Sequence, residues 1–166
     1  MGLSDRMDFK CANALELPFE DASYDAVWSQ NVSMNIPDSQ ALYREFHRVL
    51  KPGGRVFMAE LAQGPGGPLH FPVPWARKPE ISFLQTPDDM REHIVAAGLE
   101  IVSFVDDSET VIEWSKRQAQ KPKPPVRPVL VPMLVFGDDF PERARNTSRN
   151  MAEQRALSIT VIARRL

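Results

Sequence analysis

Polar or small residues follow three of the apolar runs in this sequence, at positions where chemistry could be placed. They are Asn13-Ala14, Gln30-Asn31 and Glu60-Leu61-Ala62. If the runs are parallel strands of one open α/β sheet, their carboxyl ends meet at one edge, and such sheets bind ligands at that edge. Ordinary polarity at strand ends explains the same residues without a ligand. The pattern alone leaves both interpretations open.

The residue types used in nucleophilic or metal chemistry are present but poorly placed for it. The single thiol, Cys11, alternates as an inward residue of a predicted strand, so we expect a buried, unreactive cysteine. His47, His70 and His93 lack zinc-ligand spacing, and no metal site is expected. Paired carboxylates fall at predicted helix starts or turns, where capping explains them. They are Asp88-Asp89, Asp106-Asp107 and Asp138-Asp139.

The sequence GPGG at residues 64–67 follows a predicted strand, as the glycine-rich loop of a dinucleotide site does. Such a loop must open a helix whose N-terminus faces the phosphate. Here PLHFPVPWARKP follows, and its prolines prevent a regular helix because proline removes a backbone donor and fixes φ. We therefore expect a flexible loop or lid at this position rather than a phosphate site.

Composition and charge argue against several classes of partner. The 166 residues carry 20 Lys and Arg against 22 Asp and Glu, a net charge of −2, with no basic run dense enough to neutralise a nucleic-acid backbone. Nowhere do about eighteen apolar residues follow one another, as a membrane span requires. The first residues lack the apolar stretch of a signal peptide. We expect a cytoplasmic protein with neither nucleic acid nor membrane as partner.

The elements that would carry these residues alternate between strands and amphipathic helices. Strands are predicted at 7–15, 24–31, 55–61, 99–107 and 156–165. Helices are predicted from Asp38 or Ser39 to the LKPGG turn, from the Thr86–Asp89 capping box to Gly98, at 108–120 and at 139–154. The strand at 55–61 is continuously apolar, which is typical of burial on both faces. Proline clusters at 65–79 and 122–132 predict extended surface connections.

This alternation predicts an α/β fold, with a layered sheet whose faces are covered by helices. The apolar side chains around both proline clusters can pack back onto the body of the protein, so neither cluster predicts a domain boundary. We therefore expect a single domain over residues 1–166.

Two stretches, CANALELPFEDASYDAVWSQNVSMNIPD (11–38) and LYREFHRVLKPGGRVFMAE (42–60), together resemble class I S-adenosylmethionine-dependent methyltransferases. The resemblance is to the small-molecule, type 11 group that includes ubiquinone-biosynthesis and sarcosine/dimethylglycine methyltransferases. ANALELPF is similar to the acidic-loop segment, DAVWSQNVSMNI to the fourth strand and its exit, and LKPGGRVFMAE to the fifth strand. The resemblance implies a Rossmann-like sheet, S-adenosyl-L-methionine as cofactor and a small-molecule methyl acceptor.

The resemblance also implies cofactor-binding residues. Asn13 stands where the family has an aspartate that receives the adenine amino group, and the asparagine oxygen can accept the same hydrogen bond. Ala14 would meet the adenine through its backbone N–H, and Leu15 would pack against the ring. Gln30 corresponds to a position whose backbone carbonyl meets the amino group of the cofactor, and Asn31 follows it.

On the acceptor side, the resemblance places Asn31 and Met34 at the border of the substrate pocket. The segments 64–79 and 108–136 would complete it, with Trp75 and Trp114 as candidate walls. Methyl transfer is an in-line displacement at a sulfonium carbon, and orientation can supply much of the catalysis. The lack of a triad or metal site is compatible with that reaction, and no catalytic residue is assigned.

In the family, two strands and two helices precede the part that is similar to this chain, with a glycine-rich loop and an acidic residue that bind the cofactor. The chain is therefore expected to be an N-terminally truncated fold, the C-terminal two-thirds of the family domain. Two functions stay open. One is a small-molecule methyltransferase or the C-terminal portion of one. The other is a non-catalytic remnant that acts as a homodimeric scaffold, because a sheet without its central strands exposes an edge that a second copy could cover.

Overall fold

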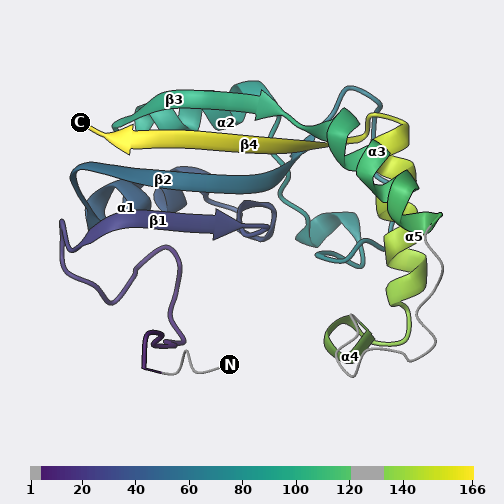
Figure 1. Cartoon of the computed structure of the whole chain (residues 1–166), viewed down its shortest axis with the longest axis horizontal. Coiled ribbons are helices and arrows are strands. Elements are labelled where there is room, and N and C mark those ends of the chain that lie inside the picture. Colours follow the sequence, from purple (N-terminus) through teal and green to yellow (C-terminus); the bar gives the residue numbers. More distant parts are fainter. Residues whose placement is uncertain (1–4, 121–132) are drawn as a thin grey trace.

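The computed structural model describes residues 5–120 and 133–166, in which strands and helices alternate as the sequence predicts (Figure 1). The elements are β1 (Tyr24–Gln30), the 3-10 helix η1 (Ser33–Asn35), α1 (Ser39–Val49), β2 (Leu50–Gln63), the 3-10 helix η2 (Pro79–Ile81), α2 (Pro87–Ala96), β3 (Leu99–Asp106), α3 (Ser108–Ala119), α4 (Met133–Phe136), α5 (Phe140–Ala152) and β4 (Ala156–Arg165). The predicted connection at 122–132 lies outside the described residues.

The sheet has the strand order β1-β2-β4-β3. β1 and β2 are parallel, whereas β4 runs antiparallel to both β2 and β3. In this register Trp28 of β1 is opposite Phe57 of β2, which is opposite Ile162 of β4. The carboxyl ends of β1 and β2 therefore lie side by side, as the expected ligand-binding edge requires.

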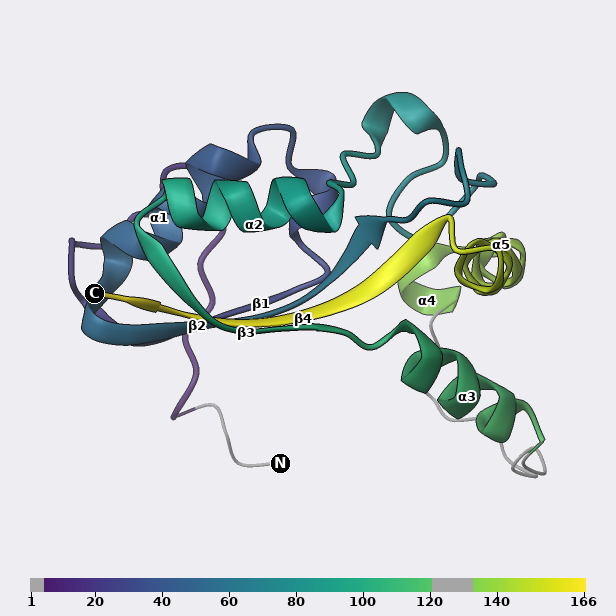
Figure 2. The ribbon, with the colours of Figure 1, turned by 90° about the horizontal axis from the view of Figure 1, so that it is seen from above.

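Helices α1 and α2 lie on one face of the sheet (Figure 2). Their buried side chains pack against alternate residues of β2 and β4 to form the core. These core residues include Leu42, Tyr43, Phe46, Met90, Ile94, Val56, Met58 and Val161. Within the described residues no helix covers the opposite face, because α3 and α5 lie past one end of the strands instead (Figure 1). The prediction that helices cover both faces is therefore wrong for the described chain.

β2 is longer and less buried than predicted. It extends over Leu50–Gln63, and buried residues alternate with exposed or half-buried ones from Gly54 onwards. Val56 and Met58 face the helices, whereas Phe57 and Leu61 belong to the open face. A continuous apolar run predicts burial on both faces only when both faces are covered. One covered face gives alternation instead.

The predicted strand at 7–15 does not form. The structure shows one isolated bridge in this region, between Asn13 and Glu16. Phe9 is 87% exposed and Cys11 is exposed as well, so the expectation of a buried cysteine is wrong. Alternating residues form a strand only when a neighbouring strand accepts their backbone hydrogen bonds. In the described residues β1 pairs with β2 alone, and the 7–12 segment joins no ladder.

The local helix signals are confirmed. Asp38 caps α1 by accepting the Ala41 N–H at 2.8 Å. Thr86 and Asp89 form the predicted capping box of α2, and Gly98 follows that helix with φ of +84°. None of the helices described by the structure combines the length and apolar character that a membrane crossing requires.

Candidate functional site

A cavity of about 480 Å³ opens where β1 and β2 end. Its lining consists of Asn31, Met34, Asn35, Leu61, Pro74, Trp75, Phe136 and Thr147. These eight residues come from the turn after β1, the end of β2, the proline-rich loop, α4 and α5. The lining is mainly apolar and aromatic, with two amides and one hydroxyl and no charged side chain among these residues. Such a cavity suits a small organic molecule.

Glu60 lies beneath the turn that forms one wall of this cavity. Its side chain is buried, with 2% exposure. Oε1 accepts the Ser29 hydroxyl at 2.6 Å. Oε2 accepts the backbone N–H groups of Val32 at 2.9 Å and Ser33 at 3.0 Å, together with the Ser33 hydroxyl at 3.0 Å. A buried carboxylate is stable only when it is well hydrogen-bonded, and these four donors supply that stabilisation.

A second set of hydrogen-bonded polar side chains lies between α1 and α2. The Gln85 amide donates to the Tyr43 hydroxyl at 3.2 Å, and its oxygen lies 2.9 Å from Nδ1 of His93. The same ring nitrogen lies 2.8 Å from the Ser39 hydroxyl. Burial raises the pKa of Tyr43 to about 12, against the effect of the Gln85 hydrogen bond, and the charge of Glu60 adds to the rise.

The proline-rich loop supplies the Trp75 wall and is fastened to α5. Asn150 exchanges two hydrogen bonds with the backbone of His70, at 2.8 and 3.0 Å, and Asn146 donates to the Pro72 carbonyl at 2.9 Å. The Trp75 indole N–H donates to Ser82 at 2.9 Å. These contacts fix the orientation of the aromatic ring toward the cavity.

Gly64 and Gly66 of this loop lie directly against the turn between α5 and β4. A Cβ atom at Gly64 would lie 2.1 Å from the Gln154 carbonyl oxygen, and one at Gly66 would lie 2.0 Å from that of Glu153. The glycines are thus required for close backbone packing. Their role differs from the flexible lid that the sequence suggested, because the loop is packed against its neighbour.

The segment expected to bind the cofactor forms a turn next to the core. The Asn13 side-chain oxygen accepts the Leu15 N–H at 3.0 Å, and Asn13 is exposed. Ala14 and Leu15 are half-buried against the core. The structure thus places these three residues at the surface of the domain, in a defined turn.

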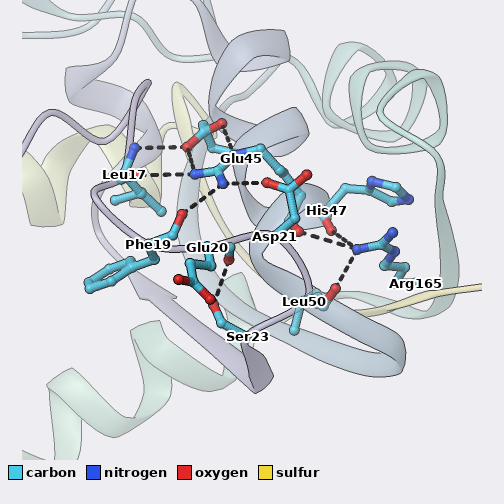
Figure 3. A network of polar contacts seen from close by, with 10 residues as sticks. Leu17, Phe19, Glu20, Asp21, Ser23, Glu45, His47, Leu50 and Arg165 are labelled. Carbon is cyan, nitrogen blue, oxygen red and sulfur yellow. Dashed lines mark hydrogen bonds and ion pairs between the residues drawn. The ribbon is translucent and has the colours of Figure 1, made fainter.

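Arg48 and Glu45 of α1 hold the residues that connect this turn to β1. Figure 3 shows Glu45 together with Leu17, Phe19 and Asp21 of this network. The Arg48 guanidinium pairs with Glu45 and with Asp21, each at 2.7 Å, and also donates to the carbonyls of Leu17 and Phe19. Glu45 accepts the Leu17 N–H at 2.8 Å. The hydrogen bond from Arg48 lowers the pKa of Glu45 below its usual value of 4.5. The geometry of the candidate cofactor segment therefore depends on α1.

The structure brings some of the predicted site residues together and separates others. Asn31, Met34 and Trp75 line one cavity. Gln30 is exposed at the end of β1, directly before Asn31, whose φ is +54°. Trp114 lies on α3, is 58% exposed and does not line the cavity.

Sequence reasoning missed five residues of the lining. They are Asn35, Leu61, Pro74, Phe136 and Thr147. Leu61 belongs to a strand end that the sequence singled out, and Pro74 and Phe136 belong to the predicted pocket segments 64–79 and 108–136. Thr147 had no signal of its own, because a hydroxyl on a surface helix resembles many others. Glu60 was recognised as a strand end, but its buried contacts were not foreseen.

Comparison with known proteins agrees with these observations. Residues 2–58 match the family model described as methyltransferase domain. The chain is 34% identical over 119 residues to 27-O-demethylrifamycin SV methyltransferase from Amycolatopsis mediterranei, an alignment that covers 69% of this chain and 43% of that protein. The chain thus spans less than half of this curated relative.

Solved structures share the fold. Geranyl diphosphate C-methyltransferase from Streptomyces coelicolor A3(2) aligns with 99% of this chain and 55% of its own length, with a TM-score of 0.73 and 17% identity. The [4+2]-cyclase SpnF aligns with 99% of this chain and 57% of its own length, with a TM-score of 0.66 and 24% identity. Residues 2–58 are therefore similar to the methyltransferase domain family, and the chain has the Rossmann-like α/β fold of structures solved for methyltransferases in complex with S-adenosyl-L-methionine or S-adenosyl-L-homocysteine.

Proposed function

We propose that this chain is the whole or the C-terminal portion of an S-adenosylmethionine-dependent methyltransferase that acts on a small molecule. The observation that carries the proposal is the convergence of Asn31, Met34 and Trp75 on one cavity at the sheet edge where α/β folds bind ligands. The name of the relative from Amycolatopsis mediterranei supports methyl transfer, and structural neighbours in complex with S-adenosyl-L-methionine or S-adenosyl-L-homocysteine support the cofactor.

The described residues fit one side of this cofactor. The Asn13 side-chain oxygen has two lone pairs, and the Leu15 N–H uses only one of them. The oxygen can therefore still accept a hydrogen bond from the adenine amino group. Ala14 and Leu15 offer a backbone N–H and an apolar surface, and Gln30 and Asn31 lie at the open end of β1. The free edge of β1 would border the other side of the cofactor, where the described residues contribute no strand.

When bound, the cofactor supplies an electrophilic methyl group on a sulfonium. The contribution of this chain is then to bind and orient the acceptor. The Asn31 and Asn35 amides can hydrogen-bond a polar group of the acceptor, while Met34, Trp75 and Phe136 surround its apolar part and exclude water. No titratable side chain lines the cavity among the described residues, so these residues can orient the acceptor but offer it no general base.

Calorimetric titration with S-adenosylhomocysteine tests the cofactor side directly. We expect saturable binding, and we expect Ala14→Pro to weaken it about tenfold because proline removes the N–H at that position. Ala14→Ser keeps the N–H and is the matched control. Equal affinities for Ala14→Pro and Ala14→Ser, or no binding by the parent chain, would count against the proposed site. Transfer of a radiolabelled methyl group to a panel of small acceptors then tests the reaction itself. This second test is needed because the fold does not determine the reaction: a [4+2]-cyclase has the same fold.

A second candidate function is a homodimeric scaffold, and two observations favour it. The open face of the sheet carries Trp28, which is 74% exposed, and the outer edge of β1 has no partner strand in the described residues. A second copy that covers this face and edge would bury the Trp28 side chain and would pair the backbone groups of the β1 edge. A tight dimer that binds no S-adenosylhomocysteine would favour the scaffold over the enzyme.

A further inference from the structure

We infer that Glu60 is a positioning residue for the acceptor cavity, because its carboxylate holds the turn of residues 31–35 in the shape that lines the cavity. The consequence for acceptor binding rests on the proposed function. The relation between Glu60 and the turn is independent of it and can be measured separately.

The first step of the argument concerns the start of η1. Its N-cap residue, Val32, makes no side-chain capping hydrogen bond. The free N–H groups at a helix start need acceptors, and a capping side chain normally supplies one. Here Oε2 of Glu60 accepts the N–H groups of both Val32 and Ser33, together with the Ser33 hydroxyl. A carboxylate from the neighbouring strand thus replaces the missing cap.

The second step concerns the backbone that this cap stabilises. Asn31 has a left-handed φ of +54°, a conformation that is strained for residues other than glycine and that asparagine tolerates better than most. Its N–H donates to the Ala59 carbonyl at 2.9 Å, and its carbonyl accepts the Asn35 amide at 3.3 Å. Both ends of the strained residue are therefore tied to β2 or to the turn itself, and the Glu60 contacts lie directly after it.

The third step connects the turn to the cavity. Three of the eight lining residues, Asn31, Met34 and Asn35, belong to this turn, and a fourth, Leu61, follows Glu60 in β2. Met34 is 2% exposed, so its side chain cannot move without displacing its neighbours. Loss of the Glu60 contacts would alter half of the lining at once.

Glu60 is not placed to act as a general base. Both of its oxygens already accept hydrogen bonds from the protein, and the residue does not line the cavity. The geometry requires the length of the Glu60 side chain rather than its charge. A glutamine at this position has the same length. Its oxygen can accept hydrogen bonds from the three donors of the turn, and its NH₂ group can donate to the Ser29 oxygen. An aspartate keeps the charge but is one methylene too short.

The experiment compares Glu60→Gln with Glu60→Asp in a chain that also carries Trp28→Phe and Trp114→Phe, so that Trp75 is the only tryptophan. Quenching of Trp75 fluorescence by 2-naphthol, an uncharged aromatic probe, measures binding in the cavity. Amide hydrogen exchange at Val32 and Ser33 measures the turn. Glu45→Asp is the matched control, because Glu45 likewise accepts a backbone N–H but from Leu17, next to the candidate cofactor segment.

We expect Glu60→Asp to weaken 2-naphthol binding about tenfold and to accelerate exchange at Val32 and Ser33, whereas Glu60→Gln stays near the parent in both measurements. Glu45→Asp should accelerate exchange at Leu17 and leave the naphthol affinity unchanged. The reverse order, with Gln impaired and Asp intact, would show that charge matters and would overturn the inference. So would unchanged exchange in Glu60→Asp. If the parent binds no naphthol but the exchange pattern holds, the proposed acceptor site fails and the positioning role stands.

Discussion

Trp28 stacks on Phe57 across β1 and β2, with ring centroids 6.3 Å apart and an angle of 28° between the rings, yet Trp28 remains 74% exposed. One of its faces rests on a neighbour and the other faces solvent on the open side of the sheet. A tryptophan this exposed contributes little to the core of the monomer, but it offers a large apolar surface to a partner.

Replacement of Trp28 by threonine should therefore reduce self-association more than it reduces stability. Threonine suits a strand, so we expect a loss of about 1 kcal/mol or less in the free energy of unfolding. Sedimentation velocity over a range of concentrations measures the association. Trp114→Thr, which changes another exposed tryptophan on α3, is the matched control. An equal effect of both substitutions would show that the open sheet face has no special role.

Gly66→Ala should destabilise the protein by about 1–3 kcal/mol, because the new Cβ would lie 2.0 Å from the Glu153 carbonyl oxygen and the loop would have to move. Urea unfolding measures the change. Pro65→Ala, at the exposed residue between the two glycines, should change stability by less than about 1 kcal/mol. Similar values for the two variants would mean that the loop accommodates the methyl group without strain.

Glu153 should make the stability of the protein sensitive to acid. Its contacts with Arg149, His70 and Arg155 lower its pKa from 4.5 to about 2. A lowered pKa in the folded state gives stabilisation that is complete above pH 4.5 and is lost as the pH falls toward 2. Glu153→Gln should therefore melt below the parent at about pH 6, with a difference that narrows by about pH 3.

Thermal melts across that pH range check this prediction. Glu92→Gln, at an exposed position of α2 without an ion pair among the described residues, is the control and should leave the pH profile of the parent unchanged. A constant difference between Glu153→Gln and the parent at every pH would contradict the assignment.

Tyr43 should resist ionisation and should make the protein sensitive to alkali. Burial raises its pKa to about 12, so its stabilising contribution is complete below pH 10 and is lost as the pH rises toward 12. The loss amounts to about 2–3 kcal/mol. Tyr24→Phe removes the second tyrosine of the chain, and the ultraviolet absorbance of phenolate then follows Tyr43 alone. Tyr43→Phe should remove the decrease in the free energy of unfolding that the parent shows above pH 10. A phenolate transition near pH 10 in the folded protein would contradict the burial argument.

Local features were predictable because their causes lie within a few residues. The capping box of Thr86 and Asp89 needs only the chain between them, and Gly98 ends α2 because it tolerates a positive φ. The strand at 7–15 failed for the opposite reason. Its alternating pattern is real, but a strand also requires a neighbour, and sequence periodicity does not report whether one is available.

The candidate site was predictable in the same partial way. Asn31 and Met34 follow β1 in a motif with a recognisable order, and the structure places both at the cavity. Phe136 and Thr147 reach it only because α4 and α5 lie past the end of the sheet, more than seventy residues after the strand ends. Trp114 was an equally good aromatic candidate by sequence, yet α3 leaves it outside the lining.

By itself, the sequence determined the approximate boundaries of α1, α2, α3 and α5, the alternation that builds an α/β sheet and the motif of the methyltransferase domain, since each depends on neighbours along the chain. Only the tertiary structure decided which face of the sheet is covered and that Gly64 and Gly66 must be glycine. It also decided that Glu60 caps the turn at Val32 and Ser33, which precede it by 28 and 27 residues. Burial and capping of this kind arise from contacts between distant segments, and the energy of such contacts exists only once the chain has folded.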